Sequence, residues 1–276
     1  PALIDQMAIE NPAETIWSIS GKNIVKTGLN QLDTGYAFSD FGKKIFTYLK
    51  ANIKSVVFSP DGSKIAYYLS DGLNTNSLYL SNPDGKSQKS LMGALKLRDI
   101  NLLWPKNNII SLISRPSGLT TGNLWVLNTA NLGLTRLIDG LFGLEALWSP
   151  DGNNFIYSYT DQNGRSPKLA IYKKGGLKNI NNISTLVDKC AWAQDSINIY
   201  CAVPQSWPDW ATLPDDYYKN TFLTTDDLWK INTETNEKNL VFQGLGDISN
   251  LDISEDENNL FFILKENQFL YKLIIK

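Results

Sequence analysis

One short phrase occurs twice in this chain and, in weaker form, four more times. Residues 146–157 read Ala-Leu-Trp-Ser-Pro-Asp-Gly-Asn-Asn-Phe-Ile-Tyr, and a near copy occupies residues 57–67. In both, an apolar segment is followed by Ser-Pro-Asp-Gly and then by a second apolar segment. Proline fixes φ at about −65°, as a type I turn requires, and glycine can adopt the positive φ that closes such a loop. The phrase therefore predicts a tight β-hairpin that is repeated along the chain.

The six copies are regularly spaced. Their aligned strand-end residues are Trp17, Phe58, Trp104, Trp148, Trp192 and Ile253. The gaps between them are 41, 46, 44, 44 and 61 residues, and the last gap is long because one repeat carries an insertion. A period of roughly 40–50 residues with several short strands is typical of a β-propeller blade. The sequence thus predicts an all-β, six-bladed β-propeller of four-stranded antiparallel blades.

We expect a single domain over residues 1–276. The six blades are expected near residues 13–50, 54–92, 100–138, 144–184, 188–243 and 247–276. In the fourth blade, the strands are expected at 144–148, 154–159 and 168–172, with an outermost strand near 179–183. The last blade has only three expected strands, whereas the apolar segment Leu3–Ile9 has no partner of its own. We therefore predict that the N-terminal strand, within residues 2–10, completes the last blade and closes the ring, which also covers a strand edge.

The repeated aromatic residues at the strand ends have two interpretations. A large side chain there can fill the wedge between adjacent blades and bury up to about 250 Å². The same tryptophans could instead face one cavity and form a ligand cage. We favour the wedge, because buried aromatic residues usually belong to the core.

Composition excludes several functional classes. The net charge is only −2, so nothing indicates a nucleic-acid partner or an anionic membrane surface. Apolar runs such as 260–264 are strand-sized, which argues against membrane insertion of this segment. Histidine is absent, which rules out Ser-His-Asp and Cys-His catalysis within the chain. No signal-peptide pattern is present, and the start at Pro1 suggests a processed or trimmed product.

The repeat resembles that of TolB-type propellers, which are similar to WD-repeat propellers. The resemblance is carried by the phrase at residues 58–67 and by its partner at 148–157, and it extends loosely over the whole chain. The same repeat occurs in the propeller domains of prolyl oligopeptidases. In those enzymes the catalytic residues lie in a separate hydrolase domain, and no Gly-x-Ser-x-Gly nucleophile elbow occurs here. The resemblance thus implies the fold but says little about function, because the residues that the family shares are structural.

The only two cysteines, Cys190 and Cys201, flank the turn around Asp195 and Ser196. Pairing the strands around that turn places them opposite each other or one residue apart, which is close enough for a disulfide. The alternative is two buried free thiols. We favour the disulfide, which would imply an oxidising compartment and thus a secreted, periplasmic or cell-surface protein. A zinc site is disfavoured, because two thiolates without histidine fill only half of the coordination shell, and we expect no bound metal or cofactor.

The insertion at residues 204–222 lengthens the fifth repeat. It combines many aromatic residues with carboxylates, and we single out five residues as candidate ligand contacts: Trp207, Asp209, Trp210, Tyr217 and Tyr218. Aromatic rings beside carboxylates can bind a carbohydrate, a peptide or a cationic group. Alternatively, the insertion folds back and merely covers the edge of its blade. Long loops on rigid scaffolds often carry binding sites, so both interpretations stay open.

These observations predict a non-catalytic, extracytoplasmic binding or scaffold module. It would engage a protein or carbohydrate partner through one face of the propeller. One alternative is an enzyme that uses carboxylates at the mouth of the central channel, such as a glycosidase or a lyase. Another is a structural domain of a longer, membrane-anchored or surface protein. Propellers serve all three purposes, so the fold does not decide between them. Several acidic, Arg or Tyr side chains converging in one pocket would favour the enzyme.

Overall fold

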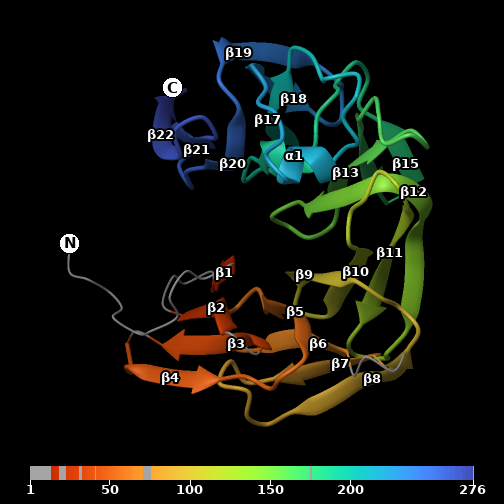
Figure 1. Cartoon of the computed structure of the whole chain (residues 1–276), viewed down its shortest axis with the longest axis vertical. Coiled ribbons are helices and arrows are strands. Elements are labelled where there is room, and N and C mark those ends of the chain that lie inside the picture. Colours follow the sequence, from red (N-terminus) through yellow and green to blue (C-terminus); the bar gives the residue numbers. More distant parts are fainter. Residues whose placement is uncertain are drawn as a thin grey trace. The chain divides into compact units, whose positions relative to one another are not determined.

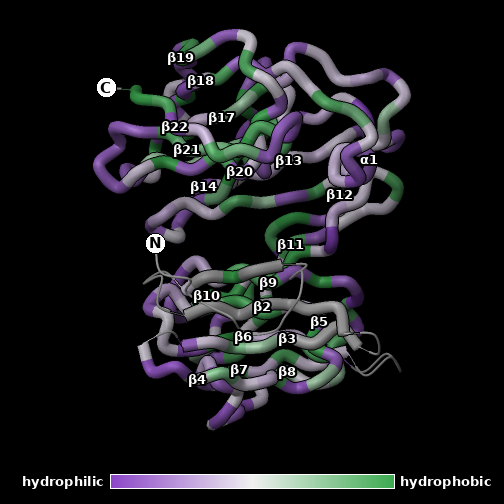
Figure 2. The backbone as a smooth tube through the Cα atoms, turned by 60° about the vertical axis from the view of Figure 1, so that its left-hand side comes forward, coloured by the Kyte–Doolittle hydropathy of each residue, from purple (hydrophilic) through white to green (hydrophobic). Residues whose placement is uncertain are grey.

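A computed structural model covers the chain and describes residues 14–18, 23–30, 33–40, 42–70, 76–174 and 176–275. The expected N-terminal strand within residues 2–10 lies outside these ranges. The described residues form an all-β structure with two short helical segments, η1 (Val187–Lys189) and α1 (Asp215–Tyr218). Figure 2 shows that hydrophobic stretches concentrate in the strands and hydrophilic ones in the connecting loops.

The chain divides into two compact units, which are described separately. The first unit comprises residues 1–114 and 124–137, and the second comprises residues 115–123 and 138–276. In both, antiparallel strands follow one another as successive hairpins, so the order of strands in each sheet is their order along the chain (Figure 1). Such local pairing is what the repeated hairpin phrase predicts.

The first unit contains two four-stranded sheets. They consist of β1 (Glu14–Trp17), β2 (Asn23–Asn30), β3 (Asp33–Asp40) and β4 (Ile45–Tyr48), and of β5 (Ile53–Phe58), β6 (Ile65–Ser70), β7 (Asn76–Ser81) and β8 (Lys89–Leu95). Three further strands follow: β9 (Ile100–Lys106), β10 (Ile109–Ser114) and β11 (Thr121–Asn128). The long strand β12 (Leu134–Trp148) then passes from the first unit into the second.

The second unit continues from β12 through the hairpins of β13 (Phe155–Thr160), β14 (Lys168–Lys173) and β15 (Gly176–Asn179). Next come the four strands β16 (Cys190–Trp192), β17 (Asn198–Pro204), β18 (Asp226–Asn232) and β19 (Lys238–Leu245). The last described sheet has three strands, β20 (Ile248–Ile253), β21 (Asn259–Leu264) and β22 (Phe269–Ile274).

The strand expected near residues 179–183 was placed wrongly. The outer strand is β15, which ends at Asn179, and after Ile180 donates a backbone hydrogen bond to Leu169 the chain leaves the sheet. Asn182 has a φ of +55°, a left-handed conformation that asparagine tolerates and a strand does not contain. The asparagine-rich segment thus forms a loop, and this loop borders the candidate site described below.

The repeated turn is held by one set of hydrogen bonds. The Ser149 hydroxyl donates to the Asp151 carboxylate (2.5 Å) and accepts from the backbone N–H of Asn154 (3.1 Å), while Gly152 has a φ of +62°. The second copy repeats the pattern from Ser59, whose hydroxyl hydrogen-bonds to Asp61 and helps to lower the pKa of that carboxyl. These contacts explain why serine, aspartate and glycine recur at fixed spacing.

Side chains at the strand ends join neighbouring sheets, as the wedge interpretation predicts. Trp192 is 6% exposed and packs among residues of β13, β14 and β17, and its indole N–H donates to the Leu147 carbonyl (3.0 Å). Phe58 packs in a cluster with Tyr36 and Phe38 of the preceding sheet. Trp148 differs, because it packs against the ring of Phe155 in its own hairpin.

Cys190 and Cys201 form a disulfide, as predicted. They are directly opposed on β16 and β17, and both are buried. The bond therefore ties the innermost strand of this sheet to its neighbour, directly before the insertion begins.

Candidate functional site

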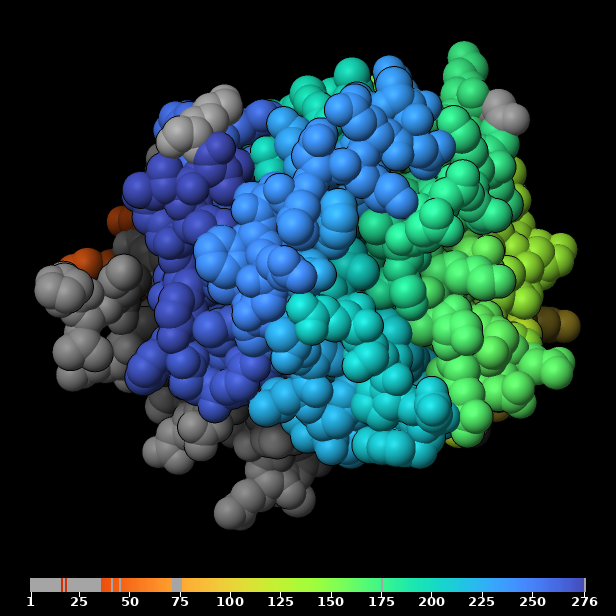
Figure 3. Space-filling view, turned by 90° about the horizontal axis from the view of Figure 1, so that it is seen from above, coloured from red at the N-terminus to blue at the C-terminus, as the bar shows by residue number. Residues whose placement is uncertain are grey.

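The insertion of residues 204–222 leaves β17, passes through α1 and returns to β18. Four buried residues form its core, with two aromatic residues packed against them: Leu186, Ala211, Leu213 and Tyr217, with Trp207 and Phe222. The Trp207 ring meets the Tyr217 and Phe222 rings edge-on, with ring centroids 5.9 and 6.3 Å apart. In Figure 3 the cyan part of the second unit, which includes this insertion, lies between the green and the dark blue residues. The insertion is thus a packed layer with its own core.

The insertion is also anchored to a loop that precedes β11. Asp215 accepts hydrogen bonds from the Ser117 hydroxyl (3.1 Å) and from the backbone N–H of Gly118 (2.7 Å). The backbone N–H of Leu213 donates to the Gly164 carbonyl (2.7 Å). A Cβ atom on Gly118 would overlap the backbone oxygen of Leu213, so this close approach requires glycine. Hydrogen bonds and close packing therefore fix the position of the insertion, which forms one wall of the groove described next.

A groove of about 1020 Å³ lies between this wall and the loops at the ends of β14 and β15. Its lining includes five buried apolar residues, Leu169, Ile180, Ile183, Ala211 and Leu213. Seven exposed polar residues also line it, namely Arg165, Ser166, Lys168, Asn179, Asn181, Asn182 and Asp209. The groove is thus amphipathic, with buried apolar surface beside exposed charges and amides.

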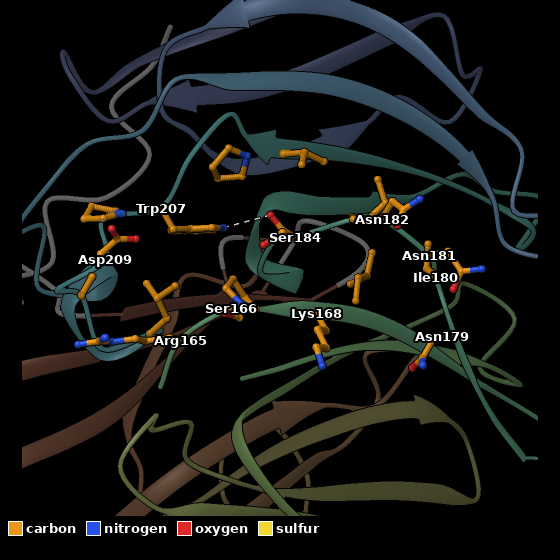
Figure 4. A pocket seen from close by; sticks show the side chains of 18 residues that line it. Arg165, Ser166, Lys168, Asn179, Ile180, Asn181, Asn182, Ser184, Trp207 and Asp209 are labelled. Atoms are coloured by element: carbon orange, nitrogen blue, oxygen red, sulfur yellow. Dashed lines mark hydrogen bonds between the residues drawn. The ribbon is translucent and has the colours of Figure 1, made fainter. Parts of the chain in front are cut away.

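Figure 4 shows how the polar groups are distributed. Trp207, Asp209 and Arg165 lie at one end of the groove, and the asparagines of the loop after β15 lie at the other. The indole N–H of Trp207 donates to the Ser184 carbonyl (3.1 Å), which fixes the ring. The groove therefore offers a ligand one aromatic ring in a fixed orientation and several side-chain amides.

The five sequence-predicted contact residues fall into four groups. Trp207 and Asp209 line the groove. Trp210 is 59% exposed, packs edge-on against Phe222 and lies outside the groove lining. Tyr217 is only 1% exposed, so its ring supports the insertion from inside and offers no face to a ligand. The hydroxyl of Tyr218 donates to Glu145 (2.5 Å), away from the groove.

Beneath the insertion, Lys189 forms a fully buried ion network. Its ammonium lies 2.6 Å from both the Asp226 and the Asp247 carboxylates and donates to the Ile248 carbonyl (2.8 Å). All three charged side chains have no solvent-exposed area. The Tyr217 hydroxyl donates to Asp247 (2.8 Å), which connects the network to the insertion. Burial raises the pKa of Asp226, and the charge of Lys189 opposes that rise.

A second polar cluster surrounds Glu145 on β12. Burial raises the pKa of Glu145 to about 8, whereas the hydrogen bond from Tyr218 opposes the rise and the nearby Asp188 and Asp215 charges add to it. Glu145 is 9% exposed, and the Ser158 hydroxyl lies 3.5 Å from its second oxygen. Glu145 is thus a carboxyl group that stays protonated at neutral pH, and it interacts electrostatically with Asp188, whose pKa burial also raises and the Lys189 charge lowers.

Solved structures that resemble this chain settle the fold. The β-propeller domain of the trilobed protease from Pyrococcus furiosus, which has an open velcro topology, matches with a TM-score of 0.66 and 12% identity over 97% of this chain and 84% of its own. Kuenenia stuttgartiensis hydrazine synthase matches with a TM-score of 0.65 and 13% identity over 98% and 78%. TolB from Acinetobacter baumannii matches with a TM-score of 0.54 and 15% identity over 92% of this chain and 64% of its own.

This chain has the fold of a TolB-type β-propeller. The predicted resemblance is therefore confirmed at the level of the fold. No protein-family model and no curated protein matches the sequence. At these identities the similar structures establish the propeller fold only, so the chemistry of the site has to be argued from its own residues.

Most of the groove was not found by sequence reasoning. Arg165, Lys168, Asn179, Asn181 and Asn182 come from loops that sequence analysis treated as ordinary connections or as a strand. One signal was available: three asparagines within four residues, at 179–182, disfavour a strand. The meeting of this loop with the insertion depends on the arrangement of the propeller's strands in space, which no local pattern encodes.

Within the ranges given above, no group of three or more Cys, Asp or Glu side chains is placed to hold a metal ion. The helical segments among the described residues are too short and too polar to cross a bilayer.

Proposed function

We propose that this propeller is a non-catalytic, extracytoplasmic binding or scaffold module, and that its partner, a protein or a glycan, binds in the groove beside the insertion. One observation carries the proposal. A groove of about 1020 Å³ combines an apolar lining, a fixed tryptophan and exposed amides, which is the usual composition of a ligand site.

The finer architecture belongs to the same proposal. The propeller would have six blades in a single domain over residues 1–276, with the ring closed by the N-terminal strand. The three-stranded sheet β20–β22 supports this, because the outer strand β22 carries the exposed side chains Phe269, Leu270 and Ile274. A fourth strand paired there would protect the edge. Deleting residues 1–13 should lower the melting temperature, and an unchanged value would contradict the closure.

The buried disulfide supports a place outside the cytoplasm, because such bonds persist in oxidising compartments. Mass spectrometry of the protein from its native source, after alkylation without reduction, should find Cys190 and Cys201 linked. Two alkylated thiols in that material would contradict the assignment.

The binding proposal is tested by a screen of the intact protein against immobilised glycans and peptides. Trp207→Ala should weaken binding at least tenfold, which corresponds to about 1.4 kcal/mol or more. Trp210→Ala is the matched control, because it removes the same side chain of the same insertion outside the groove. Equal binding by both variants to every ligand found would remove the groove from the functional account.

A second candidate function, carboxylate-based catalysis in the manner of a glycosidase or lyase, is favoured by the Glu145 cluster. Two neighbouring carboxyl groups, Glu145 with a pKa raised to about 8 and Asp188 with a pKa that burial also raises while the Lys189 charge lowers it, have the character of a general acid and a base. The test is hydrolysis or elimination on a panel of activated glycosides and uronides. Turnover that Glu145→Gln abolishes would establish this function, and its absence across the panel would reject it.

A further inference from the structure

A smaller cavity adjoins the groove. It has a volume of about 240 Å³, and both cavities are lined by Asn182, Ile183, Val203 and Pro204. Its lining also includes Trp229 and Lys238, and the Lys238 ammonium donates to the Asn181 carbonyl (2.9 Å). Trp207 therefore belongs to one cavity and Trp229 to the other, with the asparagine-rich loop shared between them. The combined site has an indole in each part.

Several of the polar groups of the site are side-chain amides, and two of them have unused hydrogen-bonding capacity. In the part of the chain that the structure describes, the carboxamides of Asn181 and Asn182 have no hydrogen-bond partner, and both residues are exposed. A carboxamide places a donor and an acceptor side by side, as each pair of neighbouring sugar hydroxyls does. Arg165, Lys168 and Asp209 leave the lining with a net charge of only +1, so it carries no strong charge of either sign.

The apolar part of the lining fits the same class of ligand. A sugar ring has one face of C–H groups and an edge of hydroxyls, so it buries well where an aromatic ring and apolar residues lie beside amides. The groove alone, at about 1020 Å³, is at the upper limit of the roughly 300–1,000 Å³ typical of small-molecule sites. This volume suits a chain of sugars better than a single ring.

An extended peptide fits less well. Peptides of that kind are usually held by backbone hydrogen bonds to a strand edge. Here only Asn179 of the edge strand β15 lines the groove, and the rest of the lining comes mainly from loops. The site therefore offers few of the backbone groups that a peptide would pair with.

We infer that the ligand of this groove is an oligosaccharide that lies along the asparagine-rich loop and contacts Trp207. The inference rests on the proposed function, namely that the groove is the binding site, and it names the chemical class of the ligand.

The test uses isothermal titration calorimetry of the intact chain with linear, neutral oligosaccharides of increasing length, and with extended peptides as the comparison set. Affinity should rise with the number of sugar rings until the groove is filled. Asn181→Ala removes an exposed carboxamide without disturbing a buried group, and it should weaken binding about threefold to tenfold. Trp207→Ala should weaken it more, and Trp210→Ala should bind as the parent does.

The outcomes separate the two levels of the proposal. Length-dependent sugar binding that is weakened by Asn181→Ala supports the inference. If peptides bind, Trp207→Ala weakens that binding and no sugar binds, then the ligand is not an oligosaccharide, although the groove remains the binding site. Sugar binding that neither groove variant changes overturns the inference. Binding of other ligands that no groove variant changes overturns the proposed function as well. Failure of every oligosaccharide to bind overturns the inference.

Discussion

Replacing Lys189 with methionine should be among the most damaging single changes in the second unit. The Lys189 ammonium has no solvent-exposed area and lies 2.6 Å from each of two buried carboxylates, Asp226 and Asp247. Methionine occupies similar space but removes the ammonium that lies 2.6 Å from both carboxylates, and leaves only the more distant charge of Lys265 to interact with them. Removing one partner of a buried ion network typically costs about 3–5 kcal/mol, because the remaining charge stays buried and unpaired.

For a unit of this size, 1 kcal/mol shifts the melting temperature by roughly 2–4 °C, so Lys189→Met should lower it by about 10 °C. The assay is thermal unfolding followed by circular dichroism at neutral pH. Lys173→Met is the matched control, because Lys173 pairs with Glu234 at 3.6 Å while both side chains are partly exposed. Such a pair contributes about 0–1 kcal/mol, so the control should shift the melting temperature little.

Two further measurements test the physical reason. Neutralising the carboxylates in the Lys189→Met background, by Asp226→Asn and Asp247→Asn, should recover part of the lost stability. The deficit of Lys189→Met should also shrink as the pH falls, because the unpaired carboxyl groups can then take up protons. A shift below about 2 °C for Lys189→Met, or no recovery on neutralisation, would refute the account.

Three other changes test the rest of the structure. The pKa of Glu145 is raised from 4.5 to about 8, so the folded state holds a proton that the unfolded state releases, and the free energy of unfolding should fall as the pH rises from 4.5 to 8. Urea denaturation at a series of pH values measures this fall, and Glu145→Gln should reduce it. The Cys190–Cys201 disulfide joins residues 11 apart, so by the loop-entropy relation its reduction should lower the free energy of unfolding by about 3 kcal/mol. Chemical denaturation with and without reductant measures the difference. Gly118→Ala should lower the free energy of unfolding by about 1–3 kcal/mol, because the new Cβ would overlap the backbone of the insertion. Gly93→Ala is the control, since no atom lies within 4 Å of its Cβ, and equal melting temperatures for the two variants would contradict the close packing.

Local sequence patterns predicted the hairpins well, because each hairpin is formed by neighbouring residues. The serine, aspartate and glycine of the phrase at 149–152 make the turn with their own hydrogen bonds, and the strands on either side follow from apolar runs of the right length. The pairing of Cys190 with Cys201 could be predicted for the same reason, since a short turn sets the register of its two strands.

The same reasoning failed where side chains from distant segments meet. Residues 179–183 were expected to form an outermost strand, and their place beside the insertion followed only from the packing of the propeller's hairpins. Tyr217 was expected to meet a ligand, but it lies at 1% exposure with its hydroxyl on Asp247. Sequence spacing does not show which aromatic residue of a loop turns inward, because the choice depends on the surface that the loop covers.

The amino-acid sequence by itself determined the repeated hairpins, the disulfide pair and the propeller-type fold, since all of these depend on contacts between residues close in sequence or on a regular repeat. The tertiary structure alone decided that Lys189 is buried between two aspartates, that Glu145 keeps its proton, and that Trp207 and the asparagine-rich loop line one groove. These features arise from the desolvation and packing of residues far apart in the chain, and no local pattern records them.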